Sequence, residues 1–156
     1  MVAVKDTVFF ALIHDFFKIY LPKQKNCSPH TIKSYKTALE ALLDFVKVCK
    51  GVRLSDVTFE MIDRHMLTAF LDSIEAGGNS ISTRNLRLNC IRAFYNYVAK
   101  MESAAVIYQD EIRKVPLKKS DRLDTVEYMS EVAVKALLAA PNVNAKLNPS
   151  QKLKRY

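Results

Sequence analysis

Residues 28–51 read SPHTIKSYKTALEALLDFVKVCKG, and this stretch decides the fold. Ser28 offers a hydroxyl that can cap a helix, and Pro29 at the first helical position costs no hydrogen bond. From Ile32 onward, apolar side chains recur at steps of three and four residues, which is the spacing of one buried helix face. Gly51 follows where a left-handed C-terminal cap is expected. The stretch therefore predicts one long amphipathic helix.

Further helical patterns lie on both sides of this stretch. They are residues 4–21 ended by Pro22, a helix capped by Thr58 that ends at Gly77 and Gly78, a helix capped by Asn79 or Ser80 that runs to about Val98, and a weaker stretch over residues 103–111. The helix after Ser80 has a main apolar stripe, and Leu86, Cys90 and Tyr97 add apolar surface on another side, so we expect it to be central. No alternating run predicts a strand. The sequence therefore predicts an all-α fold, a compact four-helix bundle in residues 1–111.

Residues 112–127 read as an exposed basic linker, because Pro116 cannot continue a helix and positive charges surround it. These charges are Arg113, Lys114, Lys118, Lys119 and Arg122. Residues 128–156 follow as a separate segment, which begins with a short helix that Ser130 can cap and Pro141 is expected to close. The residues after Pro141 are polar and basic without periodicity, so we expect a flexible tail.

The charge balance favours a polyanionic partner. The chain carries 24 Lys and Arg against 16 Asp and Glu, a formal net charge of +8. Such a charge attracts polyanions over a screening length of roughly 10 Å. Nucleic acid is therefore the first partner to expect, and the alternative is that the charge only keeps a small protein soluble.

The three cysteines and three histidines give no sign of a metal or redox site. Cys27, Cys49 and Cys90 form no CxxC pair and no ligand spacing with histidine. We expect Cys49 and Cys90 to be buried thiols in a reduced, cytoplasmic protein. The apolar run at residues 8–13 is too short to span a membrane and lacks a secretion signal. No metal and no membrane partner are therefore expected.

Motifs for catalysis are also missing from the sequence. Three glycines in the whole chain leave no phosphate-binding loop, and no nucleophile, metalloprotease or paired-carboxylate motif appears. His14, His30 and His65 stand alone, and isolated histidines are more often packed or solvated than ligating. We expect no catalytic residue and no cofactor.

Positive charge gathers near the start of two predicted helices. The residues are Lys33 and Lys36 on one helix and Arg84, Arg87 and Arg92 on the other. Helix N-termini add backbone donors and a positive dipole end, which suit phosphate groups. On the second helix a polar arc offers amides and a guanidinium to base edges, or else is an ordinary solvated face. The arc comprises Ser82, Asn85, Asn89, Arg92 and Asn96. Arg92 could equally pair with Asp44 or Asp72.

Three sets of motifs, in this order, resemble the tyrosine recombinase (phage integrase) family. The first is SPHTIKSY at residues 28–35, and the second is STRNLRL at residues 82–88 with IRAFY at residues 91–95. The third is PLKK at residues 116–119, followed by YMSE at residues 128–131 and ALLAAP at residues 136–141. The first two resemble the core-binding domain of that family, a SAM-like bundle, and the third resembles its linker and the start of its catalytic domain.

The resemblance implies that the partner is double-stranded DNA, held in its major groove by the second and fourth helices. The DNA contacts that it implies are Thr31, Lys33, Ser34, Lys36, Arg84, Asn85, Arg87 and Arg92, with linker contacts from Lys118 and Lys119. The family's chemistry is attack by a tyrosine on a backbone phosphate, with residues that lie beyond the position of Pro141. No residue here matches those motifs, and Tyr156 is not expected to be the nucleophile.

The expected function is therefore that of the DNA-binding domain of a site-specific tyrosine recombinase (DNA integration and recombination), without strand cleavage by this chain. We expect a monomer in the absence of DNA. The alternative is a helical protein-interaction module that docks through Val134, Leu137 and Leu138. A helix-turn-helix regulator ranks last, because the predicted helices are too long for that motif.

Overall fold

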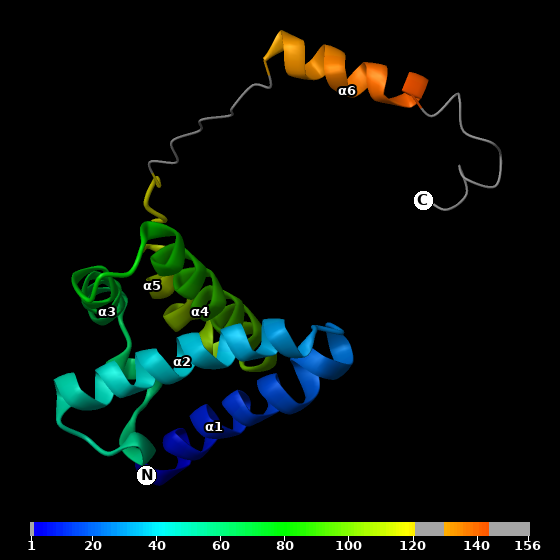
Figure 1. Ribbon diagram of the computed structural model, residues 1–156. Coiled ribbons are helices and arrows are strands. Elements are labelled where there is room, and N and C mark those ends of the chain that lie inside the picture. Colours follow the sequence, from blue (N-terminus) through cyan, green and yellow to red (C-terminus); the bar gives the residue numbers. More distant parts are fainter. Residues whose placement is uncertain (1, 121–129, 144–156) are drawn as a thin grey trace. The chain divides into compact units, whose positions relative to one another are not determined.

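The computed structural model describes residues 2–120 and 130–143, and it is helical in both ranges, with no strand in either. The chain divides into two compact units, Met1–Ser120 and Asp121–Tyr156, which are treated separately below (Figure 1). The predicted all-α fold is confirmed. No helix among the described residues is both long and apolar enough to cross a membrane.

The first helical segment continues past the point where it was expected to stop. Helix α1 spans Val2–Asp15 and passes into a π-helical segment, η1, over Phe16–Gln24. The prediction that Pro22 ends the helix was wrong, because Pro22 lies inside η1. Proline lacks only its own amide hydrogen bond, and the wider π turns already depart from the i→i−4 ladder that its ring would disrupt. The chain leaves the helix through Asn26, whose φ of 50° lies in the left-handed region that asparagine tolerates.

Helix α2, Pro29–Lys50, has the expected capping at both ends. Ser28 Oγ accepts a hydrogen bond from the amide of Thr31 at 3.2 Å. Gly51 ends the helix with a φ of 63°, a conformation that costs an L side chain about 1–2 kcal/mol. The prediction for this stretch is confirmed.

The connection after α2 contains two short 3₁₀ turns, η2 over Leu54–Asp56 and η3 over Phe59–Met61, before helix α3 at Arg64–Ala76. The prediction that Thr58 caps this helix was wrong. Asp63 is the cap, and its Oδ1 accepts a hydrogen bond from the amide of Met66 at 2.7 Å. A carboxylate satisfies the free amides of a first turn at least as well as a hydroxyl, so the α-helix begins after Asp63.

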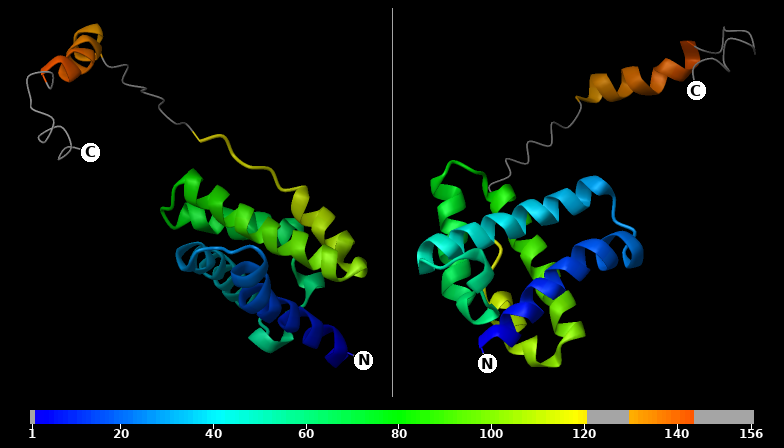
Figure 2. Two further views of the ribbon diagram at one scale, coloured as in Figure 1. Left: turned by 90° about the vertical axis from the view of Figure 1, so that its right-hand side faces the viewer. Right: turned by 90° about the horizontal axis from the view of Figure 1, so that it is seen from below.

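Helix α4, Ile81–Met101, is central, as predicted. It packs against α2, α3 and α5, and in the left view of Figure 2 it lies in a layer with α5 over α1 and α2. A 3₁₀ turn, η4 at Ser103–Ala105, leads into α5 at Val106–Arg113. The weaker pattern expected over residues 103–111 is therefore helical.

The core of the first unit is rich in aromatic rings. Phe16 has no exposed surface, and its ring centroid lies 5.3 Å from those of both Phe94 and Tyr97. Tyr35 meets the same ring edge-on at 5.8 Å. Offset and edge-on ring pairs of this kind add to the stabilisation that burial alone provides. The aromatic side chains of α4 therefore belong to the core.

The two helical cysteines differ in exposure. Cys90 on α4 is buried as predicted, whereas the prediction that Cys49 is buried was wrong, because that residue is exposed. Cys49 lies in the last turn of α2, where Val48 is 77% exposed, so the helix has already passed the edge of the core.

The second unit contains helix α6, Glu131–Val143. Ser130 Oγ accepts a hydrogen bond from the amide of Ala133 at 3.2 Å, which confirms the expected cap. The prediction that Pro141 closes this helix was wrong, since the helix continues to Val143. In the last turn a proline removes a single hydrogen bond, which limits its cost. The expected flexible tail and the linker beyond Ser120 lie outside the described residues.

Candidate nucleic-acid interface

A groove runs between the first turns of α2 and α4, the two helices with positively charged starts. It has a volume of about 270 Å³ and is lined by His30, Lys33, Ser34, Thr37 and Ala38 from α2 and by Thr83, Leu86, Arg87 and Cys90 from α4. Each set follows the three- and four-residue spacing of one helix face. The α2–α4 groove therefore lies between one face of α2 and one face of α4.

Both helices begin with a serine cap close to this groove. Ser80 caps α4, and its Oγ accepts a hydrogen bond from the amide of Thr83 at 3.2 Å. Ser28 does the same for α2 through the amide of Thr31. A capped N-terminus carries the positive end of the helix dipole, so both helices raise the local potential near their first turns.

Two cations of the groove have no acidic partner. Lys33 is exposed and Arg87 is half-buried. Among the described residues no carboxylate forms an ion pair with either of them, whereas Lys36 Nζ, two residues after Ser34, lies 3.7 Å from Glu40 Oε1. Lys33 and Arg87 are therefore available to an anion from outside.

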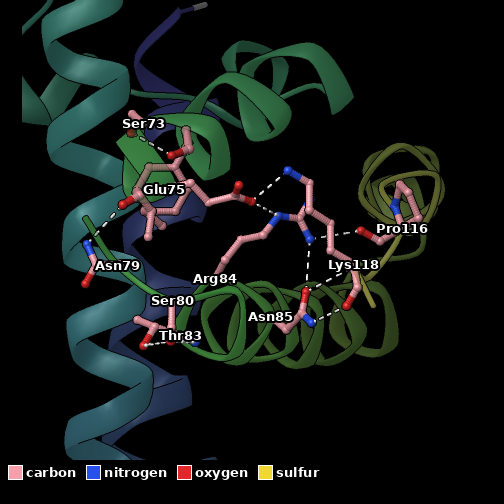
Figure 3. A network of polar contacts seen from close by, with 11 residues as sticks. Ser73, Glu75, Asn79, Ser80, Thr83, Arg84, Asn85, Pro116 and Lys118 are labelled. Atoms are coloured by element: carbon pink, nitrogen blue, oxygen red, sulfur yellow. Dashed lines mark hydrogen bonds and ion pairs between the residues drawn. The ribbon is translucent and has the colours of Figure 1, made fainter. Parts of the chain in front are cut away.

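Other side chains of α4 form a different arrangement, which we call the linker clasp (Figure 3). Arg84 is only 3% exposed, and its Nε lies 3.2 Å from Glu75 Oε1. Its Nη1 donates hydrogen bonds to the carbonyl oxygen of Pro116 at 3.1 Å and to Asn85 Oδ1 at 3.0 Å. Lys118 Nζ reaches the same Glu75 oxygen at 2.7 Å. A buried guanidinium thus joins the end of α3 to the segment after α5.

Asn85 and Arg92 complete the linker clasp. Asn85 Nδ2 donates to the carbonyl oxygen of Lys118 at 2.7 Å, and its Oδ1 accepts from the amide of Lys118 at 3.1 Å. Arg92 Nη2 donates to the carbonyl oxygen of Val115, and Val115 itself is buried. Residues 115–118 of the expected linker (residues 112–127) are therefore bound to α4 through their backbone. The first two residues of that range, Ile112 and Arg113, belong to α5.

Burial shifts the pKa of two side chains on α4, Arg92 and Cys90. The pKa of Arg92 is lowered, first by burial and then by the neighbouring charge of Arg84. The pKa of the Cys90 thiol is raised by burial, so it stays protonated at the floor of the groove. Neither shift indicates a reactive group, because a catalytic thiol needs a lowered pKa.

The residues predicted to contact DNA thus fall on two sides of α4. Lys33, Ser34 and Arg87 line the groove, while Arg84, Asn85, Arg92 and Lys118 belong to the linker clasp. Thr31 and Lys36 on α2 are not among the residues that line the groove, and the Thr31 hydroxyl is 3.0 Å from Ser28 Oγ. Lys119, which directly follows residues 115–118, is exposed.

Sequence reasoning missed several residues of the groove. His30, Thr37, Thr83 and Leu86 line it but were not among the predicted contacts. Their spacing from Lys33 and Arg87 by three or four positions was the available signal. The polar arc of α4 is only partly free, since Asn85 and Arg92 hold the linker and Asn96 Oδ1 accepts a hydrogen bond from Gln109 Nε2 at 2.6 Å. Arg92 pairs with a backbone carbonyl, not with Asp44 or Asp72 as the alternative proposed.

Comparison with known proteins gives a consistent picture. Residues 14–102 match the family described as the phage integrase N-terminal SAM-like domain. Two proteins of Sinorhizobium fredii named as integrase/recombinase, y4rD and y4rC, are 33% and 36% identical over 132 residues, which is 84% of this chain. The tyrosine recombinase XerC of Halalkalibacterium halodurans is 31% identical over 84 residues, 54% of this chain and 26% of its own length.

The chain spans less than half the length of each of these relatives, 47% of y4rD, 40% of y4rC and 26% of XerC. No solved structure matches the chain significantly. The matched range starts in α1 and ends just after α4, so it includes both helices of the groove. This chain therefore belongs to the phage integrase family, of which it carries the N-terminal SAM-like domain.

Proposed function

We propose that this chain binds duplex DNA through the α2–α4 groove, as the DNA-binding half of a site-specific tyrosine recombinase. The observation that carries the proposal is that Lys33 and Arg87, beside two capped helix starts, form no ion pair with any carboxylate in residues 2–120 and 130–143. Lysine and arginine next to helix N-termini suit phosphate groups, and an α-helix fits the major groove. Lys33, Ser34 and Arg87 are the direct contacts in this proposal, with Thr31, Lys36 and Lys119 at the edges.

Arg84, Asn85 and Arg92 have a different role in the proposal, which is to position the linker. A guanidinium that is 3% exposed and already bonded to Glu75 and Pro116 has little capacity left for a phosphate. By fixing residues 115–118 on α4, these side chains set where the basic linker begins. Lys118 and Lys119 would then approach the backbone of the same duplex.

Binding of one domain to one face of the duplex neutralises few phosphates. We therefore expect an affinity near the non-specific range of roughly 10⁻⁴ to 10⁻⁶ M and a strong dependence on salt. Strand cleavage by this chain is not expected, because phosphoryl transfer needs several preorganised positive groups and a held nucleophile around one phosphate. A denaturing gel that showed a covalent protein–DNA adduct would contradict this part of the proposal.

The test is a fluorescence-anisotropy titration of a labelled random-sequence duplex at several salt concentrations. The double variant Lys33→Ala, Arg87→Ala should flatten the salt dependence by about one unit of slope for each lost phosphate contact. The matched control is Lys50→Ala, Lys100→Ala, which removes two exposed charges from the other ends of the same two helices. The control should keep the wild-type slope.

The alternative function is a helical protein-interaction module, favoured by α6. Two apolar side chains on that helix, Val132 and Leu138, are 77% and 69% exposed. If the wild type fails to bind duplex DNA even at low salt, the DNA-binding proposal fails and this alternative takes its place. Equal salt slopes for the two double variants would overturn the choice of the α2–α4 groove.

A further inference from the structure

The α2–α4 groove contains one side chain that phosphate binding does not use. Leu86 lines the groove next to Arg87 and is 55% exposed, although it belongs to the central helix of the unit. Single exposed leucines are common on protein surfaces and need no explanation by themselves. This one stands between cations on a surface that the proposed function brings against DNA.

The floor of the groove beside Leu86 is also apolar. Ala38 is 1% exposed and Cys90 is 4% exposed, and both line the groove. Burial keeps the Cys90 thiol neutral, so this floor carries no charge. The groove therefore combines two cations, Lys33 and Arg87, with an apolar floor.

Two of the groove's hydroxyl protons, those of Ser34 and Thr37, are bonded within α2. Ser34 Oγ donates to the carbonyl oxygen of His30 at 3.2 Å, and Thr37 Oγ1 donates to that of Lys33 at 3.0 Å. These bonds lie within α2 and do not depend on a ligand. His30, Lys33, Arg87 and the hydroxyl of Thr83 remain as donors to a partner, and Ser34 can donate to a phosphate only by giving up its bond within α2. Leu86 and the floor of the groove favour an apolar group.

We propose that Leu86 reads the 5-methyl group of thymine, so that this domain prefers A·T base pairs at the position opposite α4. In the major groove only thymine presents a methyl group, and apolar side chains distinguish it from the other bases. The flanking cations would hold the phosphates on either side. The inference rests on the proposed DNA binding and adds a base preference to it.

The test compares two pools of random duplex, one made with thymidine and one with deoxyuridine, which lacks only the methyl group. Anisotropy titrations of the full chain should show tighter binding to the thymidine pool by up to about fourfold, the value of one buried methyl group. Leu86→Ala should remove this difference while keeping the salt slope. The matched control is Ile107→Ala, an exposed apolar residue on α5 outside the groove, which should keep the difference.

The possible results distinguish the thymine preference from the proposed DNA binding on which it rests. Steep salt dependence with equal affinity for both pools would overturn the thymine preference and leave DNA binding intact. A thymidine preference that survives in Leu86→Ala would also overturn it, because the methyl group would then be read elsewhere. Absence of binding to both pools at low salt would overturn the inference and the proposed function together. Thermal unfolding by circular dichroism confirms that the compared variants are folded.

Discussion

Arg84 and Glu75 form an ion pair in which the guanidinium is almost fully buried and the carboxylate is not. Arg84 Nε lies 3.2 Å from Glu75 Oε1, and their side chains are 3% and 28% exposed. Glu75 belongs to the last turn of α3 and Arg84 to the first turns of α4, on either side of the Gly77–Gly78 turn. The carboxylate also binds Lys118 Nζ at 2.7 Å. One acidic side chain thus stabilises a buried charge and anchors the start of the linker.

The first prediction concerns that carboxylate. Glu75→Gln should lower the free energy of unfolding by about 1–3 kcal/mol, because Arg84 keeps its charge in a buried site without a compensating anion. Partial exposure of Glu75 keeps the loss below that of a fully buried pair. Glu40→Gln is the control, since its pair with Lys36 is exposed and should contribute less than about 0.5 kcal/mol. Urea unfolding measures both, and equal losses would mean that the buried pair has no special weight.

Local signals made part of the fold predictable. Ser28, Ser80 and Gly51 act within one helical turn, so their roles follow from adjacent sequence. Thr58 and Asp63 are both good caps, and the sequence alone does not say which of them starts α3. Cys49 fits the apolar period of α2 but lies beyond the core, and the extent of a core depends on packing between distant segments.

The candidate site was predictable to a lesser degree, for the same reason. Arg84 and Arg87 lie three positions apart and look alike in sequence, yet one is buried in the linker clasp and the other lines the groove. The difference arises because folding brings Glu75 and the Pro116 carbonyl to Arg84. Leu86 was recognised as apolar surface outside the main stripe, but its place in a cationic groove depends on how α2 packs on α4.

The second prediction tests how Asn85 holds the linker. Asn85→Ala removes both hydrogen bonds to the Lys118 backbone. The freed groups of the exposed Lys118 can bond to water, but the buried Arg84 Nη1 also loses Asn85 Oδ1 as an acceptor. The loss of global stability should therefore be about 1–2 kcal/mol. The amide of Lys118 should exchange its hydrogen faster, as followed by NMR. Asn89→Ala, at an exposed position on the same helix, should leave that exchange rate unchanged; a change there would point to general loosening of α4.

The third prediction concerns the buried phenol of Tyr95. Its hydroxyl is buried and has no hydrogen-bond partner in the part of the chain that the structure describes, and burial raises its pKa well above the ordinary value of 10.0. Tyr95→Phe should therefore leave stability unchanged or raise it by about 1 kcal/mol at neutral pH, because an unsatisfied polar group is removed.

The raised pKa of Tyr95 also gives a pH dependence. Above pH 10 the phenol ionises in the unfolded chain but not in the folded one, so the wild type loses stability as pH rises through that range. Tyr95→Phe lacks this loss, and its advantage over the wild type should grow above pH 10. Urea unfolding at neutral and alkaline pH measures the difference, and an advantage that did not change with pH would contradict the burial of this hydroxyl.

The last prediction separates Arg84 from Arg87 by two independent readouts. Arg84→Ala should lower the free energy of unfolding by about 2–4 kcal/mol, since Glu75 and the Pro116 carbonyl lose a buried partner. Arg87→Ala removes a half-buried cation with no acidic partner and should change stability by less than about 1 kcal/mol, yet reduce the salt slope of DNA binding by about one.

Measured on folded protein at low temperature, Arg84→Ala should keep the wild-type salt slope. A reduced slope in that variant would show that Arg84 leaves Glu75 and contacts a phosphate in the complex. The exchange would have a physical basis, because a phosphate and the Glu75 carboxylate offer the guanidinium the same bidentate geometry. A reduced slope in Arg84→Ala together with an unchanged slope in Arg87→Ala would move the DNA-binding face from the α2–α4 groove to the side of the linker clasp.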